Sequence, residues 1–107
     1  MFVRNEISKR EVELQVRGTL SGDAAEEFQI SLQNLVAGGH KTITLNLSEV
    51  PSINSTCIGK ILLLRKNLTE QDRVIRIRGC SDALYNTFQL IKFDKLVSID
   101  RATDQAT

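Results

Sequence analysis

The part of the chain that most constrains its fold is residues 42–68, because the spacing of apolar residues changes within it. In residues 42–47 polar and apolar residues alternate, as they do in a strand with one buried face. After Pro51 the apolar spacing lengthens to three and four residues, which is the period of a helix. The apolar sides carry Ile43, Leu45 and Leu47 in the strand, and Cys57, Ile61, Leu64 and Leu68 in the helix, widened by Ile58 and Leu62. The sequence therefore predicts a buried strand, a polar turn and a helix in direct succession.

Three polar residues, Asn54, Ser55 and Thr56, stand where this helix should begin. Their side chains can accept hydrogen bonds from the first backbone N–H groups of a helix, which have no partner within the helix itself. Two roles are therefore open for Ser55: it is the N-cap of the helix, or it presents an exposed hydroxyl group that can be modified.

The N-terminal part of the chain predicts a hairpin and a helix. Residues 2–8 and 11–17 alternate like two strands, joined by a tight turn at residues 8–10. A helix should follow Asp23 and end at the glycine pair 38–39. Its buried face would consist of Ala25, Phe28, Leu32, Leu35 and Val36, with Ile30 facing outward.

The C-terminal part predicts another strand at residues 74–78, ended by Gly79, and a short helix capped by Ser81. The inner face of that helix would carry Leu84, Phe88 and Ile91. A last strand is expected at residues 96–99, and residues 101–107 are expected to fray.

Strands and helices that alternate in this way predict an α/β fold with parallel strands joined by right-handed crossovers. The sheet should have four or five mostly parallel strands behind the N-terminal hairpin, with the helices chiefly on one face. The other face should be open to solvent, because strands covered on both faces would be continuously apolar. The polar residues expected on that open face include Thr42, Thr44, Asn46, Arg76 and Arg78.

Length and composition limit the number of domains and the kinds of partner that this chain can have. A chain of 107 residues, 41% of them hydrophobic, suffices for a single domain over residues 1–107. Its net charge of +1 offers no global attraction to nucleic acid, a membrane surface or an acidic substrate. Aromatic residues make up only 5%, too few to stack on nucleic acid bases, although Arg65, Arg73, Arg76 and Arg78 concentrate positive charge. No apolar run approaches the roughly 20 residues that span a bilayer, so we expect a cytoplasmic protein without membrane insertion.

No recognisable spacing brings together residues for catalysis, metal binding or a cofactor. His40 has no nucleophile and orienting group at helical or strand spacing, and there is no glycine-rich phosphate loop. Cys57 and Cys80 form neither a CxxC pair nor a His/Cys cluster, and we expect two reduced thiols. The sequence thus favours a non-enzymatic protein with no catalytic residues, no metal and no cofactor.

The central motif resembles that of the STAS domain, in particular of bacterial anti-sigma factor antagonists. The similarity rests on Leu45-Asn46-Leu47-Ser48 at the end of the strand and Asn54-Ser55-Thr56-Cys57-Ile58-Gly59 at the helix start. It extends to the glycine pair 38–39 and to Asp94-Lys95-Leu96. The resemblance implies a β–α superhelix, and it agrees with the fold that the alternation of strands and helices predicts independently.

The resemblance also implies a function. In this family the serine at the position of Ser55 is phosphorylated by an anti-sigma factor kinase of the GHKL type. The resemblance thus implies phosphorylation of Ser55 here, and Thr56 is the second choice. Asn54 and Cys57 replace the Asp and first Gly of the usual motif, and they favour an alternative without phosphorylation. That alternative is an adaptor subunit of a stress-signalling complex or of a lipid-transport system, whose partner is another STAS-complex subunit. A weak homodimer is a further option.

Partner contacts are expected around the start and the outer face of the central helix. The residues assigned to this surface are Asn54, Ser55, Thr56, Gly59, Leu63 and Lys66. Leu63 is an apolar residue on the polar side of the helix and could anchor a partner. Gly59 lowers helix stability by roughly 0.5–1 kcal/mol relative to alanine, which suggests that another group approaches the helix closely there.

Overall fold

The computed structural model describes residues 2–101. Its elements are β1 (Phe2–Glu6), β2 (Glu11–Arg17), α1 (Ala24–Ala37), β3 (Thr42–Glu49), α2 (Ser55–Glu70), β4 (Val74–Cys80), α3 (Asp82–Leu90), the 3-10 helix η1 (Phe93–Lys95) and β5 (Ser98–Arg101). The strands form a sheet in the order β1-β2-β3-β4-β5. β1 runs antiparallel to β2, and every other neighbouring pair is parallel. The predicted α/β fold, with its hairpin and mostly parallel sheet, is confirmed.

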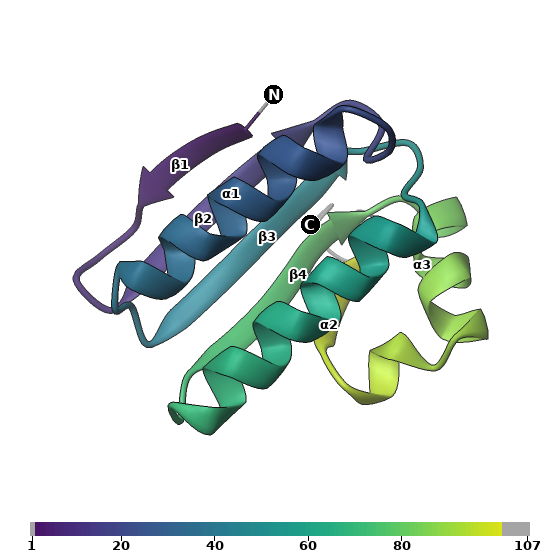
Figure 1. Ribbon diagram of the computed structural model, residues 1–107. Helices are drawn as coiled ribbons and strands as arrows, with labels where there is room; N and C mark the ends of the chain where they lie inside the picture. The colour runs from purple at the N-terminus through teal and green to yellow at the C-terminus, as the bar shows by residue number, and fades with distance from the viewer. Residues whose placement is uncertain (1, 102–107) are drawn as a thin grey trace.

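The helices pack on one face of this sheet. Figure 1 shows α1 and α2 side by side across the sheet, with α3 and η1 next to α2. The predicted apolar stripes of the strands and helices meet in a hydrophobic core between the two layers, except that Leu62, expected to widen the stripe of α2, is 38% exposed. Its helical members include Phe28, Leu32 and Leu35 of α1, and Cys57, Ile61, Leu64 and Leu68 of α2. Burial of these stripes explains why the 3.6-residue period could be recognised in the sequence.

The loop between β3 and α2 is pinned to the loop that precedes α1. Leu20 donates its backbone N–H to the carbonyl of Ser52 (3.0 Å) and accepts a hydrogen bond from the N–H of Asn54 (3.0 Å). The side chains of Leu20 and Val50 are both buried beneath these loops. The start of α2 therefore occupies a fixed position at the edge of the helical layer.

Three predictions about the C-terminal part were wrong in detail. Gly79 does not end β4 but lies inside it, with φ of 78° at an irregularity in the pairing with β5. Ile91 is exposed, because α3 ends at Leu90 and Lys92 turns the chain away in a left-handed conformation (φ 60°). The last strand begins two residues later than predicted, at Ser98.

The predicted fraying of residues 101–107 is also wrong at its first position. Arg101 is the last residue of β5. The rest of that segment, residues 102–107, lies outside the described residues. Within residues 2–101, none of the helices is both long and apolar enough to cross a bilayer.

Candidate functional site

Asn54 initiates α2. Its backbone is extended (φ −90°, ψ 168°), and its side-chain Oδ1 accepts a hydrogen bond from the N–H of Cys57 at 2.8 Å. This geometry is that of an N-cap, which satisfies one of the free donors of the first turn. The interpretation of Ser55 as the N-cap is therefore wrong, because Asn54 holds that position and Ser55 is the first residue of the helix.

The hydroxyl group of Ser55 is available at the surface. Ser55 is exposed, and within residues 2–101 its side chain makes no hydrogen bond. The first turn of α2 contains no acidic residue, so the positive end of the helix dipole is not neutralised by a neighbouring side chain on that turn. A negatively charged group on Ser55 would thus be placed where the helix favours it.

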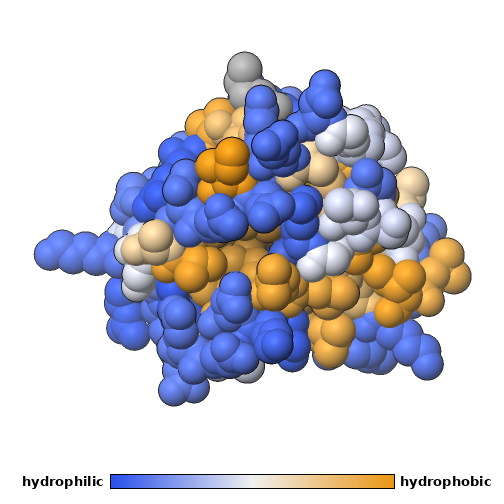
Figure 2. Space-filling model, viewed as in Figure 1, coloured by the Kyte–Doolittle hydropathy of each residue, from blue (hydrophilic) through white to orange (hydrophobic). Residues whose placement is uncertain are grey.

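A groove of about 350 Å³ runs between α1 and α2, next to this serine. Figure 2 shows apolar surface along the middle of this face of the molecule, flanked by polar side chains. The groove is lined by Gln29, Leu32, Gln33 and Val36 of α1, and by Thr56, Gly59, Lys60, Leu63, Leu64 and Asn67 of α2. Leu63, which is 57% exposed, presents an apolar side chain there without a place in the core.

The structure brings together only part of the predicted partner surface. Thr56, Gly59 and Leu63 line the groove beside the exposed Ser55. Lys66 is exposed on α2 but does not line the groove, and the side chain of Asn54 is occupied by capping. An alanine Cβ at position 59 would meet nothing within 4 Å, so no close contact of this chain requires glycine there.

Sequence patterns did not reveal the contribution of α1 to the groove. Gln29 and Gln33 flank the apolar stripe of α1, to which Val36 belongs, and the contribution of all three to the groove depends on the packing of α1 beside α2. The available signal was the hydrogen-bonding capacity of two glutamines four residues apart, which lie on one side of a helix.

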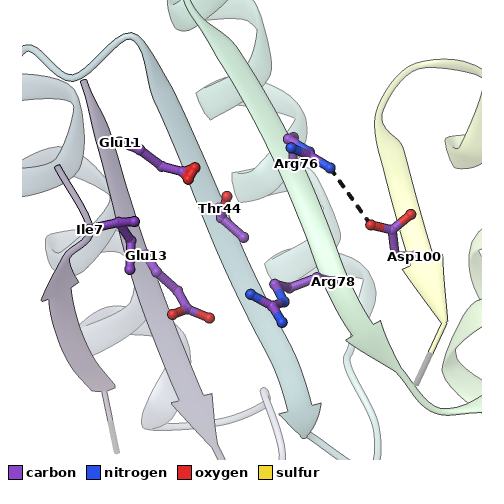
Figure 3. Close-up of a pocket in the computed structure, with 7 residues that line it drawn as sticks. All are labelled: Ile7, Glu11, Glu13, Thr44, Arg76, Arg78 and Asp100. Carbon is purple, nitrogen blue, oxygen red and sulfur yellow. Dashed lines mark ion pairs between the residues drawn. The ribbon is translucent and has the colours of Figure 1, made fainter. Parts of the chain in front are cut away.

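A second hollow, of about 270 Å³, lies on the opposite, open face of the sheet. Figure 3 shows carboxylates of β2 on one side of Thr44 and guanidinium groups of β4 on the other. Its lining comprises Ile7, Glu11, Glu13, Thr44, Arg76, Arg78 and Asp100. Arg76 and Asp100 form a long ion pair of 3.8 Å, and Asn46 donates to Glu13 at 2.9 Å. The polar side chains agree with the predicted solvated face, although Thr44 itself is 8% exposed.

His40 and the two cysteines are buried in the interior. His40 is buried, and its Nε2 lies 2.9 Å from a carboxylate oxygen of Glu6. This hydrogen bond is the main reason that the pKa of Glu6 is lowered. Among the described residues no group of three or more His, Cys, Asp or Glu side chains could hold a metal ion.

Both thiols are free and buried, and they should react slowly in the folded protein. Burial raises the pKa of the Cys57 thiol, and burial, assisted by the Asp100 carboxylate, raises the pKa of the Cys80 thiol to about 12. Since the thiolate is the reactive form, titration with a disulfide reagent near pH 8 should be slow for native protein and rapid in urea. A disulfide between the 2 cysteines of the chain would leave no thiol to titrate in urea.

Comparison with known proteins identifies the architecture. A family model described as "Mlab, STAS domain" matches residues 3–98. An anti-sigma factor antagonist from Mycobacterium paratuberculosis is 15% identical, with a TM-score of 0.85 over 99% of this chain and 89% of that chain. The Bacillus cell fate determinant SpoIIAA in its phosphorylated form is 17% identical (TM-score 0.73, 92% of this chain and 90% of that one).

The same fold occurs in a sulfate transporter family protein from Wolinella succinogenes, at 16% identity and a TM-score of 0.77 over 95% of this chain and 85% of that chain. No curated protein sequence shows significant similarity. Because the family model spans most of the chain and the sheet and helices follow the same architecture, this chain belongs to the STAS domain family described as Mlab.

Proposed function

We propose that this STAS domain is a regulatory protein of the anti-sigma factor antagonist type. It binds an anti-sigma serine kinase with the start of α2 and the α1–α2 groove, and phosphorylation of Ser55 switches this binding off. The observation that carries the proposal is the unoccupied, exposed hydroxyl of Ser55 at the first position of α2, beside the apolar groove. The likeness to solved structures named as anti-sigma factor antagonists supports it.

Phosphorylation at this position would change the surface more than the fold. A phosphoryl group adds roughly −1.5 to −2 charges, and the adjacent helix N-terminus stabilises negative charge. The capping hydrogen bond from Cys57 goes to Asn54, so α2 keeps its cap when Ser55 is modified. A partner packed over Ser55 would meet both added bulk and a charge that it must desolvate. The ATP for the reaction is bound by the kinase.

A non-phosphorylated adaptor is the second candidate. Asn54 offers no carboxylate to a kinase, since it carries an amide and uses that amide oxygen to cap α2. The matching family model is described as Mlab, and a transporter family protein shares the fold. In this function the same groove would hold a fixed subunit of a stress-signalling or lipid-transport complex.

Phosphorylation can be tested with ATP and a panel of anti-sigma serine kinases, including any encoded beside this gene. We expect intact-mass measurement to show one added phosphoryl group, and peptide mapping to place it on Ser55. Ser55→Ala should abolish the modification and retain kinase binding, whereas Ser55→Asp should fold normally and bind at least about tenfold more weakly, because it adds a charge to the contact.

Ser52→Ala is the matched control, since Ser52 is an exposed hydroxyl residue in the loop just before α2. The Ser52→Ala variant should be phosphorylated to the same extent as the chain without substitutions. Modification that survives in Ser55→Ala and disappears in Thr56→Ala would move the site to Thr56. Tight kinase binding without any phosphorylation would contradict the switch and support the adaptor.

A further inference from the structure

β1 leaves one edge of the sheet unpaired within residues 2–101, because it is the first strand in the order and pairs only with β2. Figure 1 shows its outer side lying free of the other elements. Proteins commonly protect such an edge with lysine, proline or a bulge. β1 has the sequence Phe-Val-Arg-Asn-Glu and an uninterrupted register, so it contains no lysine, proline or bulge, and its two charged residues, Arg4 and Glu6, are of opposite sign.

The register with β2 determines which backbone groups face outward. Ile7 donates its N–H to the carbonyl of Glu11 at 3.1 Å, so the N–H of Ile7 faces β2 at the hairpin end. In an antiparallel ladder hydrogen-bonded and non-hydrogen-bonded pairs alternate. Asn5, paired with Glu13, therefore directs its backbone groups toward β2. The N–H and C=O groups of Arg4 and Glu6 point to the free edge.

We propose that this edge pairs with the same edge of a second copy, forming a symmetric dimer with β1 antiparallel to β1 across a twofold axis at Asn5. A residue whose backbone groups point to the free edge must pair with a residue of the second copy whose backbone groups do the same. This condition leaves few possible registers between the two β1 strands. A twofold axis at Arg4 would place Arg4 opposite Arg4 of the other copy, and an axis at Glu6 would place Glu6 opposite Glu6. Only the axis at Asn5 brings Arg4 opposite Glu6 twice, and cross-strand pairs of opposite charge stabilise a sheet.

Side chains on both faces of the strand suit this register. Arg4 contacts Glu6 of its own chain with one nitrogen (3.0 Å), and Glu6 is oriented by His40. The other guanidinium nitrogens of Arg4 have no partner within residues 2–101 and can reach Glu6 of the second copy. On the opposite face Val3 would lie across from Ile7, whose side chain is 56% exposed in the single chain.

The surface beside the edge is also apolar. Phe2 and Ile30 border a shallow open hollow between β1 and α1, and Ile30 is 53% exposed. The twofold axis places α1 of both copies on the same side of the joined sheet, flanking the seam. Ile30 of each copy would then lie toward the seam and be partly covered. The proposal does not depend on phosphorylation of Ser55 or on a kinase.

Sedimentation velocity over micromolar to millimolar concentrations tests the dimer. We expect a reversible shift from the 12.0 kDa chain to twice that mass, weakened by salt. Arg4→Glu or Glu6→Arg alone should lower the association constant by about tenfold or more, because both symmetric pairs become repulsive. The double exchange Arg4→Glu with Glu6→Arg should restore association. Lys95→Glu, an exposed charge reversal on η1, should leave association unchanged.

Amide hydrogen exchange identifies the edge. With rising concentration the N–H groups of Arg4 and Glu6 should become protected, while those of Val3 and Asn5 are protected already in the single chain. Thermal unfolding of each variant serves as the control that the fold is retained. A chain that stays monomeric at millimolar concentration would overturn the proposal. So would a dimer in which exchange at Arg4 and Glu6 does not change, or a double exchange that fails to restore association.

Discussion

Replacing Ile61 by alanine is expected to lower the free energy of unfolding by about 2–5 kcal/mol, because it opens a cavity in a fully packed core. Ile61 has 0% exposure and lies in the middle of the stripe with which α2 covers the sheet. Chemical denaturation with urea measures the effect directly. If Ser55 is phosphorylated as proposed, folded molecules of Ile61→Ala should still be modified, since Ile61 is buried in the core and Ser55 is exposed at the helix start.

Leu63→Ala is the matched control on the same helix. Leu63 is 57% exposed and lines the groove, so its removal should cost no more than about 0.5 kcal/mol. If the proposed partner binds in the groove, Leu63→Ala should instead weaken that binding. If Leu63→Ala proved as destabilising as Ile61→Ala, the orientation of α2 and the assignment of its outer face to a partner would both be wrong.

The parts of the fold that could be predicted are those set by local periodicity. β2, β3 and α2 each bury one face, so the repeat of Val12-Leu14-Val16 or Cys57-Ile61-Leu64 follows directly from side-chain geometry. Where a single backbone conformation decides the path of the chain, the spacing of apolar residues does not predict it. The left-handed Lys92 ends the α3 region and exposes Ile91, although its apolar spacing fits a helix.

In the candidate site, too, some features could be predicted from local sequence and others depend on the three-dimensional structure. A helix start in the segment of Asn54, Ser55 and Thr56 was predicted, because all three types can accept hydrogen bonds from free N–H groups. Which of them is the cap depends on one residue's extended backbone, and the structure assigns Asn54. The groove could not be predicted, because it forms between α1 and α2, which are adjacent in space but separated in sequence by β3.

Replacing Arg73 by alanine is the second change expected to be large, with a loss of about 2–4 kcal/mol in the free energy of unfolding. Arg73 precedes β4, and its guanidinium group joins three backbone carbonyls at the C-terminal end of α1. It donates to Leu35 (3.2 Å), Val36 (2.8 Å) and His40 (2.7 Å), and also to the side chain of Gln71 (2.8 Å). Carbonyls of the last helical turn lack the usual partner four residues further on, although that of Leu35 also accepts a hydrogen bond from the N–H of Gly38 (3.2 Å). Charged donors make the stronger hydrogen bonds.

Arg73→Lys and Arg65→Ala separate this role from a simple effect of charge. A lysine keeps the charge but cannot match the planar fork of donors, so Arg73→Lys should still lose more than half of the stability lost in Arg73→Ala. Arg65 donates to one carbonyl, that of Leu96 (2.7 Å), and Arg65→Ala should cost about 1 kcal/mol or less. Equal losses for Arg73→Ala and Arg65→Ala in urea unfolding would show that the three carbonyl contacts of Arg73 do not hold the end of α1 in place.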